Sequence, residues 1–192
     1  AKMDTIGMPE SVRAIALDEF AKLKKAGSSE AESLRDHIAW LTDVPWSQRT
    51  EETFDSETAK QTLDADHSGM EEVKERILEC LADRKRTGSK KGAILLFTGP
   101  PGTGKTSIAG AIAQTLGSKF ERLSLGGVSD ATVLRGHGRT YIRSLPGQII
   151  RRMKSAGTIN PVILLDEVDK ISQNSSHGDP TAALLEILDP KQ

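Results

Sequence analysis

An eight-residue segment constrains this chain more than any other feature, because residues 99–106 read Gly-Pro-Pro-Gly-Thr-Gly-Lys-Thr and fit the pattern G-x-x-x-x-G-K-[ST]. An apolar run, residues 93–97, precedes the segment, and a helical stretch, residues 107–116, follows it. Where a strand leads through such a loop into a helix, the glycines let backbone N–H groups surround phosphate oxygens, and the start of the helix adds partial positive charge. The pattern therefore predicts a nucleotide-binding loop made of Gly99, Pro100, Pro101, Gly102, Thr103, Gly104, Lys105 and Thr106.

Two residues of this loop carry separate roles in the predicted site. Lys105 reaches the terminal phosphates, and Thr106 offers its hydroxyl to Mg²⁺. The alternative is a turn rich in glycine and proline that holds a lysine by coincidence. The apolar run before the loop and the helical stretch after it argue against that alternative, so we expect ATP and Mg²⁺ as cofactors.

A second segment, residues 162–165, consists of four apolar residues and ends in two acids, Asp166 and Glu167. A run without polar alternation is typical of a strand buried on both faces of a sheet. Ligands of open parallel sheets bind beyond the carboxyl ends of the strands, so both acids are expected beside the loop. We predict that Asp166 helps Thr106 to hold Mg²⁺ and that Glu167 is the catalytic residue, which accepts a proton from the attacking water. The alternative is that both acids cap the next turn.

Composition limits the class of protein. The chain has 192 residues, of which 36% are apolar and 28% are charged, which is enough for one domain and a smaller one. Its net charge of −1 gives no basic excess, so nucleic acid is not expected as the main partner. The single cysteine excludes an intrachain disulfide, and no apolar run has the length of a membrane span or of a signal core. We therefore expect an intracellular protein without a membrane partner.

The pattern of apolar residues divides the chain into two parts. The first third is helical and carries no catalytic motif, and residues 47–55 are polar and aperiodic. We place a domain boundary near Thr50, between a helical segment, 1–50, and a nucleotide-binding domain, 51–192. From residue 93 onward strands and helices alternate, which favours a doubly wound parallel sheet. The expected strands are 93–98, 120–125 and 162–165, and the expected helices around them are 105–116 and 147–156.

Several further segments make the sequence resemble one family of ATPases, the Lon proteases, whose ATPase module is of the AAA+ class. The matching segments include the phosphate-binding loop, the two acids, and stretches spread over the whole chain in the family's order. They are residues 38–41 with Pro45 and Trp46, 63–70, 73–79, 125–128, 136–142 with 146–147, 166–170, 178–180 and 183–190. The resemblance implies an α/β fold, a P-loop AAA+ parallel sheet flanked by helices and preceded by a small helical subdomain.

The resemblance also implies roles for residues that spacing alone leaves open. His67, Gly69 and Met70 match the segment that contacts adenine in that family. Tyr141 and Ile142 match a loop whose aromatic residue grips the protein substrate. Taken without the resemblance, Tyr141 fits better as a residue that covers an apolar edge.

Three positions depart from the family's usual residues. Ser68 stands where the family usually has tyrosine, Gly138 where it has arginine, and Arg143 where it has glycine. Ser68 alters the packing around adenine and by itself fits an N-cap. Gly138 and Arg143 alter the stiffness and the charge of the gripping loop.

The family implies an ATP-dependent serine protease of protein quality control. Its homohexameric ring hydrolyses ATP to unfold damaged proteins and translocate them to a Ser–Lys proteolytic domain, in the bacterial cytoplasm or an organelle matrix. The chain ends at Gln192, before the sensor strand, arginine finger, lid and proteolytic domain of that family, so we expect an incomplete AAA+ fold that alone hydrolyses ATP weakly or not at all. Two alternatives stay open. One is an AAA+ nucleic-acid motor or clamp-loader-like ATPase, and the other is a non-catalytic piece for assembly or substrate docking.

Overall fold

The computed structural model describes residues 6–87, 93–136, 145–171 and 178–189. In these ranges helices predominate, and two strands lie between them along the chain. The elements are α2 (Glu10–Leu23), α3 (Ser28–Asp43), α4 (Ser56–Asp66), α5 (Glu71–Thr87), α6 (Lys105–Thr115), β1 (Phe120–Ser124), α7 (Thr132–Arg135), α8 (Gln148–Ala156), β2 (Val162–Asp166), the 3-10 helix η1 (Val168–Lys170) and α9 (Pro180–Leu188). Within the described ranges, none of the helices is long and apolar enough to cross a membrane.

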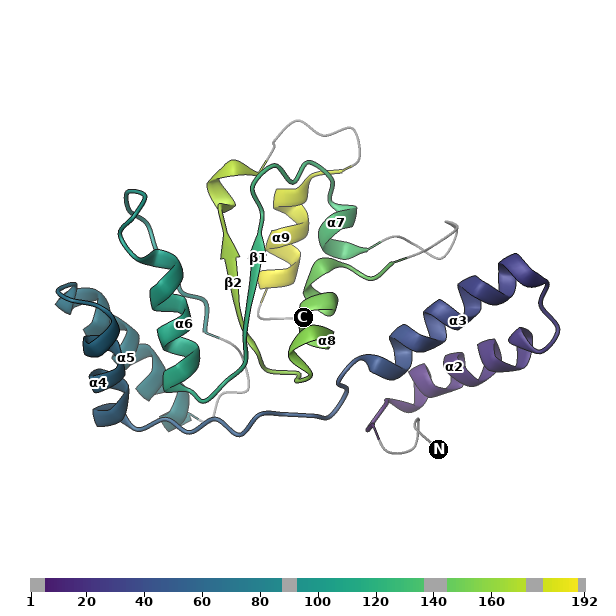
Figure 1. Ribbon diagram of the computed structural model, residues 1–192, viewed down its shortest axis with the longest axis horizontal. Coiled ribbons are helices and arrows are strands. Elements are labelled where there is room, and N and C mark those ends of the chain that lie inside the picture. The colour runs from purple at the N-terminus through teal and green to yellow at the C-terminus, as the bar shows by residue number, and fades with distance from the viewer. Residues whose placement is uncertain (1–5, 88–92, 137–144, 172–177, 190–192) are drawn as a thin grey trace.

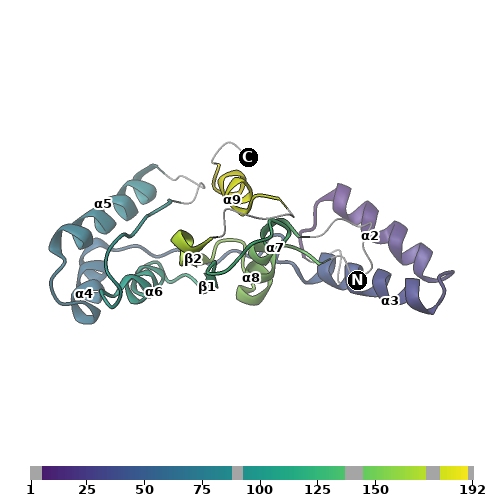
Figure 2. The same cartoon turned by 90° about the horizontal axis from the view of Figure 1, so that it is seen from above.

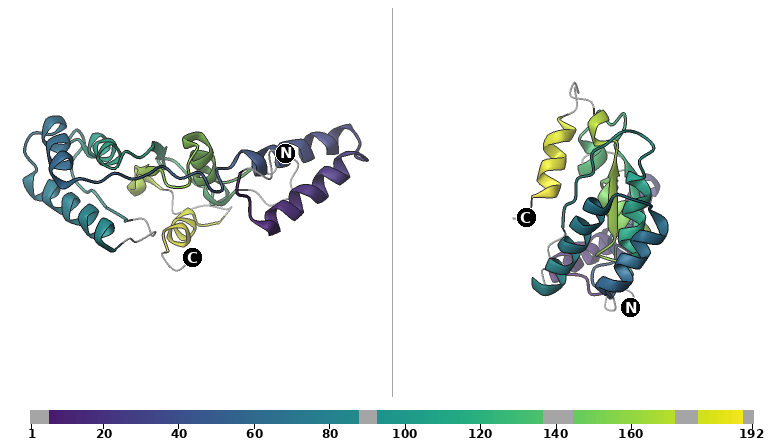
Figure 3. Two further views of the ribbon diagram at one scale, coloured as in Figure 1. Left: turned by 90° about the horizontal axis from the view of Figure 1, so that it is seen from below. Right: turned by 90° about the vertical axis from the view of Figure 1, so that its left-hand side faces the viewer.

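The molecule is elongated. The hairpin of α2 and α3 lies at one end, α4, α5 and α6 lie at the other, and the two strands stand between them (Figure 1). The chain between α3 and α4 is extended and runs past the strands, as Figures 1 and 3 show. The helical hairpin is therefore connected to α4 by an extended segment of backbone.

The two strands form a parallel pair, with Phe120 opposite Val162 and Ser124 opposite Asp166. Helices α8 and α9 lie on opposite faces of this pair (Figures 2 and 3). The predicted class, an α/β fold with a parallel sheet flanked by helices and preceded by a helical subdomain, is confirmed. Because the strands are parallel, their carboxyl ends meet at Ser124 and Asp166.

One predicted strand does not form. Residues 93–98 are extended but make no backbone hydrogen bond to any part of the chain that the structure describes. Leu95 and Phe97 pack against the core, whereas Ile94 and Leu96 are 60% and 79% exposed. The apolar run thus keeps the alternation of a strand, but a strand also needs a neighbour to pair with, and none of the described segments supplies one.

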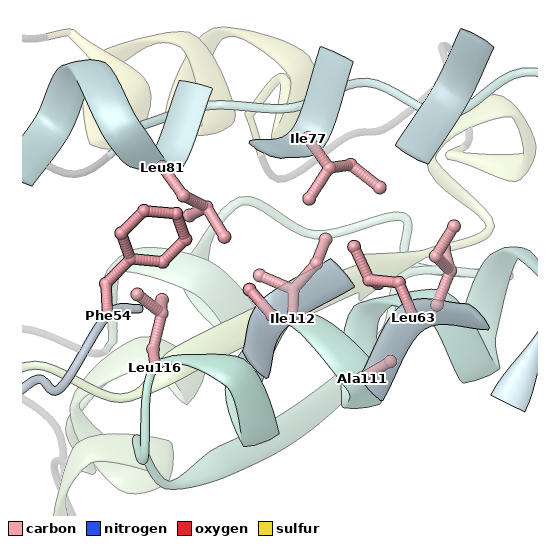
Figure 4. Packing of buried hydrophobic residues seen from close by; sticks show 9 residues of the cluster. Phe54, Leu63, Ile77, Leu81, Ala111, Ile112 and Leu116 are labelled. Carbon is pink, nitrogen blue, oxygen red and sulfur yellow. The ribbon is translucent and has the colours of Figure 1, made fainter. Parts of the chain in front are cut away.

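The main core holds α4, α5 and α6 together. In Figure 4, Leu63 of α4 and Ile77 of α5 face Ile112 of α6, and Phe54 closes the cluster beside Leu81 and Leu116. This packing fixes α6 at the flank of β2, which α6 contacts. The helix that starts at the predicted nucleotide loop is thereby held against the strand that carries the two acids.

A second core joins β1 to α7 and α9 through Leu123, Leu125, Leu134 and Leu184. The expectation of a strand buried on both faces is met only in part, since every residue of β2 is partly exposed. A third, smaller cluster lies at the base of the hairpin. In it, Ile6, Met8 and Ala16 pack against Val12, Leu41 and Trp46.

The polar segment around residue 50 is held in place by hydrogen bonds. The Thr50 N–H donates to Asn160 Oδ1 at 2.9 Å, and the Gln48 carbonyl accepts from Ile159 N at 2.9 Å. Arg84 of α5 pairs with Glu52 at 2.7 Å. These contacts fix the segment between the turn before β2 and α5, and a domain boundary near Thr50 stays a prediction.

Candidate nucleotide-binding site

The predicted phosphate-binding loop leads directly into α6, with Gly104 as the N-cap. Gly102 and Gly104 have φ angles of 80° and 84°, a backbone conformation that favours glycine. The Thr103 hydroxyl donates to the Pro100 carbonyl at 2.9 Å and closes the turn. The first N–H groups of an α-helix have no partner within the helix, so the start of α6 offers donors to an anion held by the loop.

Lys105 is the first residue of α6, and its side chain folds over the loop. Its Nζ donates to the carbonyls of Gly99 and Pro100 at 2.8 and 2.6 Å. The ammonium group therefore lies within the loop itself, at the helix end that attracts negative charge. This placement fits the predicted contact with phosphate.

Asp166 ends β2 and lies beside the start of α6. Its Oδ2 atom is 3.4 Å from the hydroxyl of Thr106, and its Oδ1 atom accepts the N–H of Glu167 at 2.9 Å. Two neighbouring oxygen ligands of an octahedral Mg²⁺, each about 2.1 Å from the ion, lie about 3 Å apart. The oxygens of Thr106 and Asp166 are close to this spacing, so the residues present fit the predicted cation.

Glu167 is held in one position by its neighbours. It adopts a φ angle of 59°, and its carboxylate accepts from Ser124 Oγ at 3.1 Å and pairs with Lys170. The hydrogen bond from Lys170, followed by the hydrogen bond from Ser124, lowers the pKa of Glu167 below its ordinary value. Gly126 leaves room for this carboxylate, because a Cβ at that position would collide with it.

A pocket of about 170 Å³ adjoins the loop on the side of α5. Its apolar wall includes Met70, Val73 and Ile108, and residues of the loop form much of the rest. Of the three residues predicted to contact adenine, Met70 lines this pocket. Gly69 is exposed and is not among the lining residues.

His67 lies behind the loop, where its Nδ1 atom would be 3.6 Å from a Cβ placed on Gly104. The side chain is buried, with 8% exposed, and its Nε2 atom has no hydrogen-bond partner among the described residues. The structure therefore brings both His67 and Met70 next to the loop. Tyr141 and Ile142 lie outside the described residues.

Two residues of the site were not predicted from the sequence. Arg122 and Ser124 share one face of β1, and they contact the two acids at the end of β2. Arg122 Nη2 is 2.7 Å from Asp166 Oδ2, and Ser124 Oγ reaches Glu167. The sequence offers only a weak signal, two polar residues spaced by two within the expected strand 120–125.

The chain matches the family model of the ATPase family associated with various cellular activities (AAA) over residues 95–192. This stretch covers half of the chain and contains β1, β2, the phosphate-binding loop and both acids. The chain therefore belongs to the AAA family of ATPases. A model of parvovirus non-structural protein NS1 also matches, over residues 47–119, which is less than half of the chain and includes the same loop.

Curated relatives narrow the comparison. The chain is 52% identical to Lon protease 1 of Bacillus subtilis (strain 168) over its whole length, which is 25% of that protein. It is 49% identical to the Lon protease of Anaeromyxobacter dehalogenans (strain 2CP-C) and 50% identical to Lon protease 1 of Thermus thermophilus, again over its whole length, which is 23% and 25% of those proteins. The resemblance to the Lon family is confirmed, and the chain spans about a quarter of the length of these relatives.

Proposed function

We propose that this chain binds Mg²⁺–ATP between the loop at residues 99–106 and Asp166, as the first part of the ATPase module of a Lon-type protease. The observation that carries the proposal is the 3.4 Å distance between Thr106 Oγ1 and Asp166 Oδ2. The two residues are 60 positions apart along the chain, and they meet because α6 packs against β2. The similarity of the relatives over the whole chain supports the same function.

Each residue has a chemical task in this proposal. Backbone N–H groups at the start of α6 and the ammonium group of Lys105 bind the phosphates, and Thr106 and Asp166 hold the cation. When bound, Mg²⁺ neutralises charge on the phosphate oxygens. Glu167 is ionised at neutral pH, as an ordinary glutamate is, and it orients the attacking water and accepts its proton.

The pocket beside the loop suits the adenine ring. Met70 and Val73 provide an apolar surface of the kind that packs against a flat base. His67 approaches the loop from behind, at Gly104. Gly69 acts indirectly in this proposal, because it sets the backbone conformation that precedes Met70.

The proposed action of the whole protein draws on the relatives that bear the name protease. We propose that ATP hydrolysis, in a homohexameric ring of the full-length protein, drives the loop with Tyr141 and Ile142 to unfold protein substrates and translocate them to a Ser–Lys proteolytic domain. We place this activity in the bacterial cytoplasm or an organelle matrix. The 192 residues alone are expected to hydrolyse ATP weakly, since they span about a quarter of these relatives.

Titration with a fluorescent ATP analogue tests the nucleotide site, with the oligomeric state followed by analytical ultracentrifugation. Lys105→Ala removes a cation from the loop and is expected to weaken binding at least about tenfold. Lys119→Ala is the matched control, because Lys119 is exposed at the opposite end of β1 from the acids. Equal affinities of the two variants would show that the loop does not bind the nucleotide.

A further inference from the structure

Arg122 makes a contact that the proposed function does not explain. Its Nη2 atom lies 2.7 Å from Asp166 Oδ2, the same oxygen that faces Thr106. The other oxygen, Oδ1, is occupied by the N–H of Glu167. A permanent cation of the chain thus sits on the carboxylate oxygen that is turned toward the expected position of Mg²⁺.

The charges around the site show how specific this pairing is. Glu167 has its own cation, Lys170, and Lys105 donates to backbone carbonyls of the loop. Each of the two acids is therefore matched with one basic residue. Of these two pairs, only the one between Arg122 and Asp166 involves an oxygen that faces Thr106.

Arg122 and Mg²⁺ cannot easily share that oxygen. With N···O at 2.7 Å and a metal bond of about 2.1 Å, the two cations would lie about 4 Å apart and repel each other. The side chain of Arg122 is 56% exposed, so solvent accommodates it when it moves away. This repulsion favours one cation at a time on that oxygen.

We propose that Arg122 occupies the Asp166 oxygen that faces Thr106 in the absence of metal and is exchanged for Mg²⁺ when Mg²⁺–nucleotide binds. The inference rests on the proposed function, since it requires nucleotide and Mg²⁺ at this site. Because Mg²⁺ has to displace Arg122, filling the site requires a higher concentration of Mg²⁺ than it would with the loop and Asp166 alone. It acts on the metal, through Asp166, and leaves the nucleotide itself untouched.

The size of the effect follows from the environment of the pair. Partly exposed ion pairs contribute little, and breaking this one is expected to change Mg²⁺ binding about two- to fivefold. The effect decreases with added salt, because the pair is accessible to screening ions.

Nucleotide titrations of the purified protein, with and without Mg²⁺, test the exchange. Affinity for a fluorescent ADP analogue is measured in EDTA and at increasing free Mg²⁺, for the wild type, Arg122→Gln and Arg122→Lys. Arg152→Gln is the matched control, because Arg152 pairs with Glu121 of β1, at 3.6 Å, rather than with either acid. The ratio of affinity with Mg²⁺ to affinity in EDTA is the measured quantity.

For Arg122→Gln we expect this ratio to rise about two- to fivefold, with affinity in EDTA unchanged, and for Arg122→Lys and Arg152→Gln to stay near the wild type. An unchanged ratio in Arg122→Gln, or weaker binding in EDTA, would overturn the exchange and assign Arg122 a structural or phosphate-binding role. If the wild type shows no Mg²⁺-dependent binding, the proposed function itself fails, which is a distinguishable result.

A measurement on the wild type covers the case in which Arg122→Gln does not fold. The NMR signal of the Arg122 guanidinium is followed during titration with Mg²⁺ in the presence of ADP. The exchange predicts a shift in proportion to bound Mg²⁺ and little shift with ADP in EDTA. A guanidinium signal that does not shift when Mg²⁺ is added would contradict the exchange.

Discussion

Met70 and Glu167 are the two non-glycine residues with positive φ among the residues that the structure describes, and both stand at the nucleotide site. The backbone of each has a φ angle of 59°, which is costly for a residue with a Cβ. Met70 lines the pocket beside the loop, and Glu167 follows the acid that faces Thr106. Strain at these two places is consistent with side chains that are held where function requires them.

The strain at Met70 predicts which of two substitutions leaves the more stable protein. Met70→Ala and Met70→Gly both remove the side chain from the pocket, but only glycine relieves the backbone. We expect Met70→Gly to be more stable than Met70→Ala by roughly 1 kcal/mol in urea unfolding, and both to bind nucleotide more weakly than the wild type. The opposite order, with Met70→Ala the more stable of the two, would contradict a strained backbone at Met70.

The residues of the site that belong to local motifs could be predicted from the sequence. The loop and the two acids are specified by short patterns, because each pattern sets its own backbone. Arg122 and Ser124 were missed, since their importance comes from the pairing of β1 with β2, which brings Ser124 to an acid 43 positions away. Side chains that act only through such a long-range contact leave no local signal.

At the scale of elements, α4 begins with a cap that depends on charge. The Asp55 carboxylate accepts from the N–H and the hydroxyl of Thr58 at 2.9 and 2.8 Å. These hydrogen bonds, chiefly the one from the Thr58 N–H, lower the pKa of Asp55 below its ordinary value of 3.8. Because the folded state favours the ionised carboxylate, Asp55 stabilises α4 above that value and loses this effect as pH falls through the folded pKa.

Unfolding in urea at pH 7 and pH 3 tests this cap. Asp55→Ala is expected to have a lower free energy of unfolding than the wild type at pH 7. The difference between the two free energies is expected to be smaller at pH 3, where the wild-type carboxyl is increasingly protonated. Asp55→Asn keeps an acceptor without a charge, and its stability relative to Asp55→Ala should not change with pH. A constant difference between wild type and Asp55→Ala at both pH values would argue against a charged cap.

The elements also show why one strand could not be predicted correctly. Residues 120–124 and 162–166 pair with each other, so the apolar patterns there become strands. Residues 93–98 have an equally apolar pattern and even the right alternation, with Leu95 and Phe97 partly buried. Apolar periodicity reports which side chains are buried, whereas a strand also depends on a paired neighbour, which the pattern does not contain.

At the scale of the whole molecule, Lys154 joins the helical hairpin to the nucleotide-binding part. Its Nζ atom lies 4.1 Å from the centre of the Trp40 ring and 3.0 Å from Asp43 Oδ2, both on α3. An apolar pocket of about 370 Å³ lined by residues of α3 and α8 lies next to this contact. Lys154 of α8 is therefore one point at which the hairpin is held to the nucleotide-binding part.

Hydrogen exchange tests this junction. Lys154→Met removes the cation and is expected to raise exchange at the end of α3 about fivefold, with nucleotide affinity unchanged. Lys22→Met is the control, because Lys22 pairs with Asp18 in its own helix α2. Equal exchange in the two variants would show that the hairpin is held without Lys154.

In the proposed site, α6 and β2 place Thr106 and Asp166 around one cation at the phosphates of ATP. A crystal structure of the protein with Mg²⁺ and a non-hydrolysable ATP analogue measures this most directly. We expect the triphosphate at the start of α6, with the ion between Thr106 Oγ1 and the Asp166 carboxylate. A triphosphate bound elsewhere, or an ion that Asp166 does not face, would contradict it.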